Sequence, residues 1–193
     1  DLANGSRLAE TVASEPPDVE AEHIDTACDI LERRGWRRYE VSNYARPGHI
    51  CRHNMAVWAG HDYIGLGPSA SSRVGYVRRT NLPDTSSYCA ALASGGHPAA
   101  ERETLTPEDD ARERLVFRLR TTAGVPLSVN TANRLSDRKR RILDAWMPRL
   151  HDLRKHGLVR IHQDRVRLSR RGFMVADTIV SQLLADAARH QHV

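Results

Sequence analysis

The sequence predicts a mixed α/β (α+β) fold in which the end of a parallel-sheet domain is followed by a mostly helical, winged-helix-like C-terminal domain. Near the start, an amphipathic helix pattern stops at Gly35 and runs directly into an apolar strand pattern at residues 36–42, which is half of an α/β unit. Near the end, two helix patterns, a hairpin pattern and a last helix pattern follow one another, which is the order of a winged helix. With 193 residues, the chain is long enough for two unequal domains.

The first helix is predicted from its cap and its apolar stripe. Asp18 is a suitable N-cap, and apolar residues then recur at helical spacing until Gly35 ends the pattern. This stripe consists of Ile24, Ala27, Cys28 and Leu31. The chain opens on Asp1, without a strand or helix signal before Leu8, so we expect the rest of the parallel-sheet domain to lie upstream.

A connector rich in Gly, Pro, Ser, Arg and aromatic residues is predicted at residues 43–83, with short strands at 63–66 and 74–79. A short helix capped by Asp84 and a polar linker through Glu103 are expected to follow. The segment is irregular and contains the residue types that usually make functional sites.

The C-terminal domain is predicted to hold four helices and a hairpin. A helix start is predicted at Thr106, whose hydroxyl can cap the helix. Pro107 suits the first helical position, and the acidic residues after it interact favourably with the helix dipole. The predicted elements are helices at 106–120, 127–135, 136–157 and from Ser169 onward, a kink at Pro148, and hairpin strands at 158–162 and 165–169. We therefore divide the chain into residues 1–83, the end of the sheet domain with the connector, 84–103, the short helix and linker, and 104–193, the C-terminal domain.

Composition and charge favour a cytoplasmic protein. The net charge is +5, and much of the basic excess lies between Arg134 and Arg171, a region that could meet phosphates, anionic lipid or an acidic partner. A solvated helical face with a hairpin is the simpler interpretation of this region. No apolar run approaches the ~20 residues that span a bilayer. Cys28, Cys51 and Cys89 are far apart, which argues against a disulfide framework and fits a reducing compartment.

Residues 39–67 are the densest run of ligand-type and turn-type residues in the chain. His53 is followed directly by Asn54 and, five positions after the histidine, by Trp58, so a short loop would offer an imidazole, an amide and a flat aromatic face. That combination suits a planar ligand, and one imidazole is sufficient as an axial ligand of haem iron. From the spacing alone, a structural histidine is the simpler interpretation.

Other kinds of site have weaker support. Cys51 and His53 are too few ligands for zinc, and their closeness in sequence does not make a catalytic pair. Gly65 and Gly67 lack the lysine or third glycine of a phosphate-binding loop, so we expect them to let the backbone pass close to another element or a ligand. The basic run at 138–141 suggests nucleic-acid contact, but the predicted recognition helix ends in apolar residues, which makes nucleic acid the less favoured partner.

The order and spacing of residues 39–70 resemble the HemW-type haem chaperones, which are relatives of oxygen-independent coproporphyrinogen III oxidase in the radical-SAM superfamily. The resemblance is carried by residues 39–48 (YEVSNYARPG), 51–54 (CRHN), Trp58, 62–67 (DYIGLG) and Ala70. A weaker likeness extends over residues 119–121 (LRT), Gly124-Val125, Gly157-Leu158 and 168–172 (LSRRG), so that nearly the whole chain is covered.

The resemblance implies an upstream partial (β/α) radical-SAM barrel whose C-x3-C-x2-C loop holds a [4Fe–4S] cluster and S-adenosylmethionine. None of that loop is in this sequence, and the three cysteines are too far apart to replace it. We therefore expect the cluster and S-adenosylmethionine only in full-length relatives, and we assign no catalytic residue to this chain. The alternatives to a haem-binding chaperone are a radical-SAM enzyme acting on a porphyrinogen and a winged-helix nucleic-acid or protein-interaction module.

In the family, an HNxxYW motif is associated with haem binding, and residues 53–58 (HNMAVW) correspond to it here, with Val57 in place of the tyrosine. The resemblance implies that His53 ligates haem iron, that Asn54 orders the loop and that Trp58 packs against the macrocycle or its pocket wall. By analogy with the oxidases, the residues near the cofactor mouth would be Gly65, Gly67, Ala70 and Ser71. It also implies transfer of haem to a respiratory membrane protein. The basic region at 134–171 would suit an anionic surface at the inner face of the membrane. The sequence does not fix the oligomeric state, for which a dimer is one option.

Overall fold

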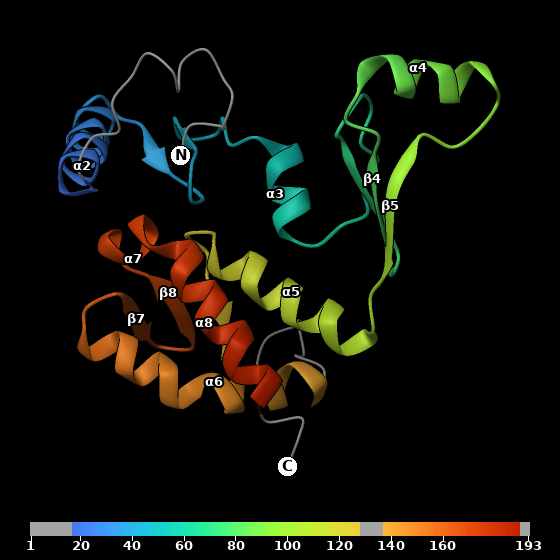
Figure 1. Ribbon diagram of the computed structural model, residues 1–193. Coiled ribbons are helices and arrows are strands. Elements are labelled where there is room, and N and C mark those ends of the chain that lie inside the picture. The colour runs from blue at the N-terminus through green and yellow to red at the C-terminus, as the bar shows by residue number, and fades with distance from the viewer. Residues whose placement is uncertain (1–16, 128–136, 190–193) are drawn as a thin grey trace.

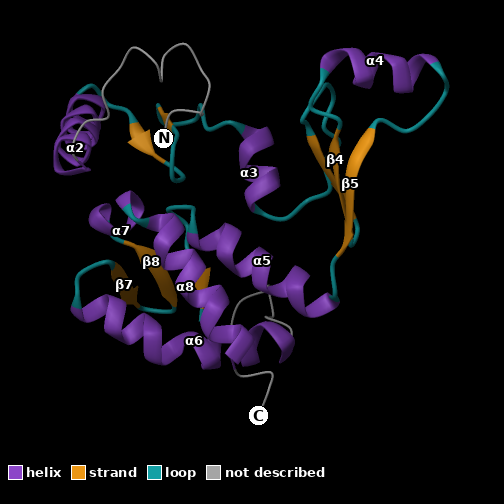
Figure 2. Ribbon diagram, in the orientation of Figure 1, coloured by secondary structure: helices purple, strands orange, loops and turns teal. Residues whose placement is uncertain are grey.

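The structure is a computed structural model that describes residues 17–127 and 137–189, and it confirms the mixed α/β fold (Figure 1). Figure 2 shows helices beside small, separate sheets, and every strand pairing among the described residues is antiparallel. None of the helices in these two ranges is long and apolar enough to cross a membrane. The helix predicted at residues 127–135, apart from its first residue, and the cap predicted at Ser136 lie outside the described residues.

The N-terminal part consists of α2 (Pro17–Arg33) and two short paired strands, β1 (Arg37–Arg38) and β2 (Tyr44–Ala45). The strand predicted at residues 36–42 is therefore shorter than expected, and the chain turns back after it. Tyr39 N–H donates to the carbonyl oxygen of Asn43 (3.1 Å), and Ser42 N–H donates to the carboxylate of Glu40 (3.2 Å). These hydrogen bonds within the turn take the place of further pairing between the two strands.

The middle of the chain holds α3 (Arg52–Trp58), the sheet of β3 (Ser71–Val74), β4 (Val77–Asn81) and β5 (Ala99–Thr104), and α4 (Thr85–Ala93). The strand predicted at residues 74–79 is divided by a turn at Gly75, where φ is +58°. The strand predicted at 63–66 contributes only a bridge from Tyr63 to Arg73. β5 occupies the predicted polar linker, because its mostly exposed residues pair with β4 instead of forming an apolar face.

Two predicted helix caps in the middle of the chain are confirmed. Asp84 accepts a hydrogen bond from Ser87 N–H (2.7 Å) at the start of α4. Thr106 Oγ1 accepts one from Asp109 N–H (3.1 Å) at the start of α5 (Pro107–Leu119). Only Thr106 and the residue before it separate β5 from α5, so the sheet is closely joined to the C-terminal part.

The C-terminal part also contains β6 (Val125–Pro126), α6 (Asp137–Lys155), β7 (Val159–His162), β8 (Arg165–Leu168), α7 (Arg170–Met174) and α8 (Ala176–Arg189). β8 lies between β6 and β7, and the predicted hairpin is confirmed. α6 continues through Pro148. The last predicted helix is two helices, because Val175 leaves helical geometry between α7 and α8 (φ −118°, ψ 27°).

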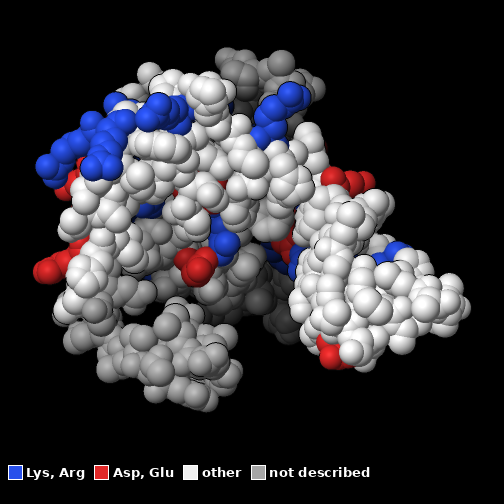
Figure 3. Space-filling view, turned by 90° about the horizontal axis from the view of Figure 1, so that it is seen from above, with Lys and Arg blue, Asp and Glu red and all other residues white. Residues whose placement is uncertain are grey.

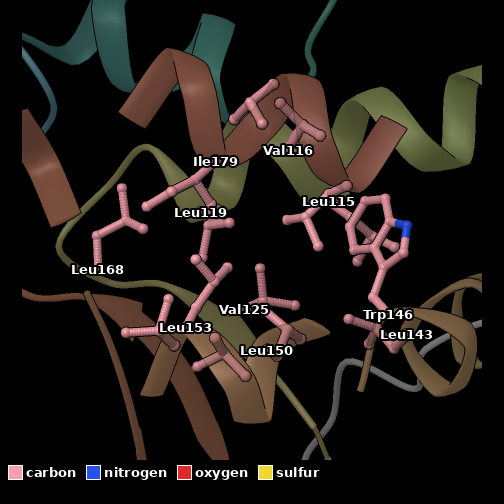
Figure 4. Close-up of a cluster of buried hydrophobic side chains, with 14 of the residues drawn as sticks. Leu115, Val116, Leu119, Val125, Leu143, Trp146, Leu150, Leu153, Leu168 and Ile179 are labelled. Carbon is pink, nitrogen blue, oxygen red and sulfur yellow. The ribbon is translucent and has the colours of Figure 1, made fainter. Parts of the chain in front are cut away.

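The main hydrophobic core lies among α5, α6, α8 and the β6–β8–β7 sheet (Figure 4). Trp146 and Leu150 on α6 meet Leu115 on α5 there, and each is at most 2% exposed. Burial of one such large apolar side chain contributes roughly 1.5–3 kcal/mol before entropic costs. The apolar stripes predicted for α6 and for the last helix are buried, apart from Leu184, which is 38% exposed.

Ion pairs fix the three-stranded sheet to α5. Arg73 on β3, only 1% exposed, pairs with Asp110, and Arg78 on β4 pairs with Glu113. Asp110 also accepts two hydrogen bonds from Arg114 Nε, at 2.9 and 3.0 Å. α5 is therefore the element against which the sheet and, as described below, α3 are positioned.

Candidate functional site

The haem-motif residues lie on α3, a helix of seven residues where the sequence predicts a loop. Cys51 is its N-cap, in extended backbone geometry, and the thiol makes no capping hydrogen bond. A helix this short is unstable by itself. Contacts with the rest of the chain must therefore hold it in place.

Those contacts come from α5. The Trp58 ring meets the Phe117 ring edge-on, with centroids 5.7 Å apart and planes at 77°, and the guanidinium of Arg120 lies 5.8 Å from the centre of the Trp58 ring. Just beyond the helix, Arg114 Nη1 donates to the carbonyl oxygen of Gly60 (2.7 Å). Trp58 is thus a packing contact between α3 and α5.

His53 lies on another side of α3. In an α-helix, five residues turn the chain about 140° beyond one full turn, so His53 and Trp58 face different directions. The His53 side chain is exposed, and it makes no hydrogen bond or ion pair with the residues that the structure describes, whereas Asn54 is half-buried. The structure therefore offers a free imidazole but does not bring it beside the Trp58 ring. The haem-binding role of each residue stays a prediction.

The turn at residues 65–71 approaches its neighbours closely. A Cβ atom on Gly65 would lie 2.2 Å from the carbonyl oxygen of Ser71, so only glycine fits, as expected for this turn. Side chains from the sheet and from α4 hold it, through the bonds Gly65 N–H to Ser72 Oγ (3.0 Å), Gly67 N–H to Tyr88 hydroxyl (3.1 Å) and Asn81 Nδ2 to Gly67 carbonyl (2.9 Å).

A hollow of about 500 Å³ lies between this turn, the three-stranded sheet and α4. Its lining is mostly apolar and includes Ile64 and Leu66, which are 74% and 85% exposed. Figure 3 shows that the part of the surface formed around α4 carries few charged side chains. Among the predicted cofactor-proximal residues, Gly65 lines this hollow; Gly67, Ala70, Ser71 and the α3 residues do not.

Sequence reasoning does not predict the polar residues that line the same hollow, among them Arg79, Tyr88 and His97. They come from β4, from α4 and from the loop before β5, and they meet only in the folded chain. His97 stands between two glycines and a proline, a pattern that indicates a turn and not a ligand. No sequence signal could have grouped them.

The cysteines do not fit an iron–sulfur cluster. Cys28 is buried and accepts hydrogen bonds from the Tyr44 hydroxyl (2.7 Å) and from Arg38 (3.0 Å). Burial, followed by the hydrogen bond with Cys28, raises the pKa of the Tyr44 hydroxyl. Cys51, just before α3, and Cys89, on α4, are both exposed. Within residues 17–127 and 137–189, no group of three or more His, Cys, Asp or Glu side chains is arranged to hold a metal ion.

Tyr39 and Glu40, at the start of the segment that resembles the HemW-type proteins, have a packing role in this chain. Tyr39 is buried, and its carbonyl oxygen accepts a hydrogen bond from Thr122 N–H (3.0 Å). Glu40, which is 1% exposed, forms a β-bridge with Thr121 just after α5. These contacts tie the segment that leads to α3 to the C-terminal part.

This fold is that of the C-terminal region of the HemN-like proteins. Residues 105–175 match the HemN C-terminal domain family. The solved structure of coproporphyrinogen III oxidase HemN from Escherichia coli, described as a radical SAM enzyme, superposes with a TM-score of 0.63 over 88% of this chain and 42% of that chain. Their sequences are 17% identical, so this likeness concerns the fold alone.

Sequence comparison finds similar proteins that are named heme chaperone HemW. The protein named heme chaperone HemW from Mycobacterium tuberculosis H37Rv is 32% identical over 188 residues, which are 95% of this chain and 45% of that protein. HemW from Bacillus subtilis 168 is 28% identical over 172 residues, 89% of this chain and 44% of that protein. The chain spans about half the length of these relatives. It is similar to these proteins over their C-terminal portion, which contains the HemN C-terminal domain.

Proposed function

We propose that this chain is the haem-handling C-terminal portion of a HemW-type chaperone, and that its His53 is a ligand of haem iron. The free, exposed imidazole on α3 carries the proposal, since an axial ligand must have an unoccupied nitrogen and open access. The relatives named heme chaperone HemW supply the ligand class. Haem is then the cargo, received in the cytoplasm and passed to a respiratory membrane protein.

The other motif residues would support His53 without touching iron. Asn54, half-buried on the same helix, is proposed to order α3. Trp58 is proposed to form part of the pocket wall through its contact with Phe117. Val57 is half-buried and has no hydroxyl group, so it cannot supply the hydrogen bond that a tyrosine would offer to a porphyrin.

The [4Fe–4S] cluster and S-adenosylmethionine are proposed only for full-length relatives. When present, they would supply radical chemistry, to which the cysteines of this chain do not contribute ligands. The role of this chain is therefore binding and transfer of haem, with a porphyrin as an alternative cargo.

Absorbance titration of haem into the purified chain tests the proposal. We expect a Soret shift on binding, and His53→Ala should weaken the affinity about tenfold, because it removes the axial ligand. The matched control is His97→Ala, which removes another exposed imidazole, one that lines the hollow beside α4.

Each outcome of this titration has a distinct meaning. Equal affinity in the wild type and in His53→Ala contradicts the ligand role of His53. A loss confined to His97→Ala places haem in the hollow. A wild-type chain that gives no Soret shift contradicts haem binding altogether.

A further inference from the structure

A basic groove of about 760 Å³ lies on the β7–β8 hairpin. Figure 1 shows where this hairpin lies in the fold. Four arginines and a histidine line the groove: Arg154, Arg160, Arg165, Arg167 and His162. The haem-binding proposal uses none of these residues. They come from the hairpin and from the last turn of α6.

The strand register places like charges directly opposite each other. Arg160 on β7 faces Arg167 on β8. The neighbouring outward-facing pair is His162 and Arg165. Directly opposed like charges destabilise an antiparallel pair. The hairpin therefore keeps an arrangement that folding alone disfavours.

No carboxylate of the described residues neutralises this cluster. The side chains of Arg154, Arg160 and Arg167 make no ion pair or hydrogen bond with the residues that the structure describes. Arg165 Nη1 donates to the carbonyl oxygen of Ala123 (3.0 Å), which leaves its positive charge without a counter-charge. These guanidinium groups are therefore available to an anionic partner.

The groove also has an apolar component. Ile161, which is half-buried, lines it beside the methylene stems of the arginines, so an occupant contacts aliphatic carbon as well as guanidinium groups. Val159 and Leu168 also border the groove but are only 2% and 5% exposed. β7 is the outer strand of its sheet, and an outer strand can accept an extended segment beside it. Guanidinium groups bind carboxylates in a planar, two-pronged geometry.

We propose that this groove binds an extended acidic segment of a partner protein, in which carboxylate and apolar side chains alternate. Such a segment places its carboxylates on the arginines and its apolar side chains against the hairpin. A flat bilayer surface would touch the rim of the groove without filling it. The sugar-phosphate backbone of a nucleic acid has no side chains to match the aliphatic lining. The interaction does not depend on bound haem.

Fluorescence anisotropy tests the groove with a short labelled peptide in which glutamate alternates with valine. The double variant Arg160→Gln with Arg167→Gln should bind this peptide about tenfold more weakly, because two charge contacts are lost. The matched control, Arg34→Gln with Arg102→Gln, removes the same charge from exposed positions outside the groove and should bind like the wild type. A peptide with glutamine in place of glutamate should bind weakly to all three proteins.

Three results would overturn the proposal. One is equal binding of the acidic peptide by the wild type and the groove variant, with circular dichroism showing both folded. Another is equal binding of the glutamate and glutamine peptides by the wild type. The last is tighter binding of the wild type to duplex DNA, or to vesicles containing phosphatidylserine, than to the acidic peptide. Haem titration of the groove variant should match that of the wild type, which separates this test from the test of His53.

Discussion

His53 and Trp58 share one short helix but have opposite environments. Trp58 packs on Phe117 and beneath Arg120, whereas His53 is exposed and without a partner among the described residues. At the scale of the residue, Trp58 holds the helix against α5, and His53 remains available to a ligand. Loss of either would impair a haem site, for different physical reasons.

Replacement of Trp58 by alanine should lower the free energy of unfolding by about 2 kcal/mol, because it removes an aromatic edge contact and a cation–π contact along with buried area. Urea denaturation measures this change. His53→Ala should stay within about 0.5 kcal/mol of the wild type, as is usual for an exposed side chain. Equal losses in the two variants would contradict the division of roles.

The sequence identifies the motif residues but not their orientation. Residue type and spacing single out His53 and Trp58, because imidazole and indole are rare and chemically distinctive. Whether they share a face depends on whether the segment is a loop or a helix, and α3 exists only through contacts with α5, more than fifty positions away. Arg79 and His97 escape sequence reasoning for the same reason.

At the scale of the element, three predicted helix caps are confirmed, whereas the cap predicted at Asp18 is wrong, because α2 already begins at Pro17. Asp84, Thr106 and Ser169 each accept a hydrogen bond from an N–H group three residues ahead, so the pattern lies within four consecutive residues. β5 is different, because its strand conformation depends on pairing with β4. The division of residues 71–81 into two strands likewise follows from a glycine turn within an otherwise strand-like run.

The cap of α4 should depend on pH. Hydrogen bonds from the Ser87 backbone and then from its hydroxyl hold the pKa of Asp84 below its ordinary value of 3.8. A lowered folded-state pKa means that the stabilisation is complete above pH 3.8 and is lost as the pH falls through the lower folded value. An NMR titration of the Ser87 amide should follow this loss.

Asp84→Asn is the matched control for this titration. The asparagine side chain also caps helices but does not titrate, so the Ser87 amide shift should stay nearly constant across the same acid range. An Asp84→Asn protein that shows the wild-type transition would assign the transition to another group.

At the scale of the whole molecule, the first helix is attached to the last part of the chain. Arg170, at the start of α7, pairs with Asp25 (2.7 Å) and with Asp29 (2.6 Å) on α2. The hydrogen bonds that Arg170 donates to Asp29 and then to Asp25 raise the pKa of its guanidinium, so Arg170 keeps its charge. Sequence patterns predict α2 and α7 separately but contain no signal for this distant contact.

Arg170→Gln should release α2 from the C-terminal part. Hydrogen exchange in residues 17–33 should become several-fold faster, because local opening loses the contacts that oppose it. Arg171→Gln removes the same charge from an exposed neighbour that makes no ion pair within the described residues, and it should leave the exchange unchanged. Added salt should weaken the wild-type attachment in the same direction, since these groups are largely exposed. Equal protection of α2 in both variants would show that other contacts hold it.

The ion pairs between the three-stranded sheet and α5 would link two fragments of this protein if the chain were cut between β5 and α5. The family match begins at position 105, directly after β5, where the protein would naturally be split into two fragments. The first fragment would carry Arg73 and Arg78, and the second would carry their partners Asp110 and Glu113. Mixed together, such half-chains should recognise each other and reassemble, because each fragment presents the charges that complete the other.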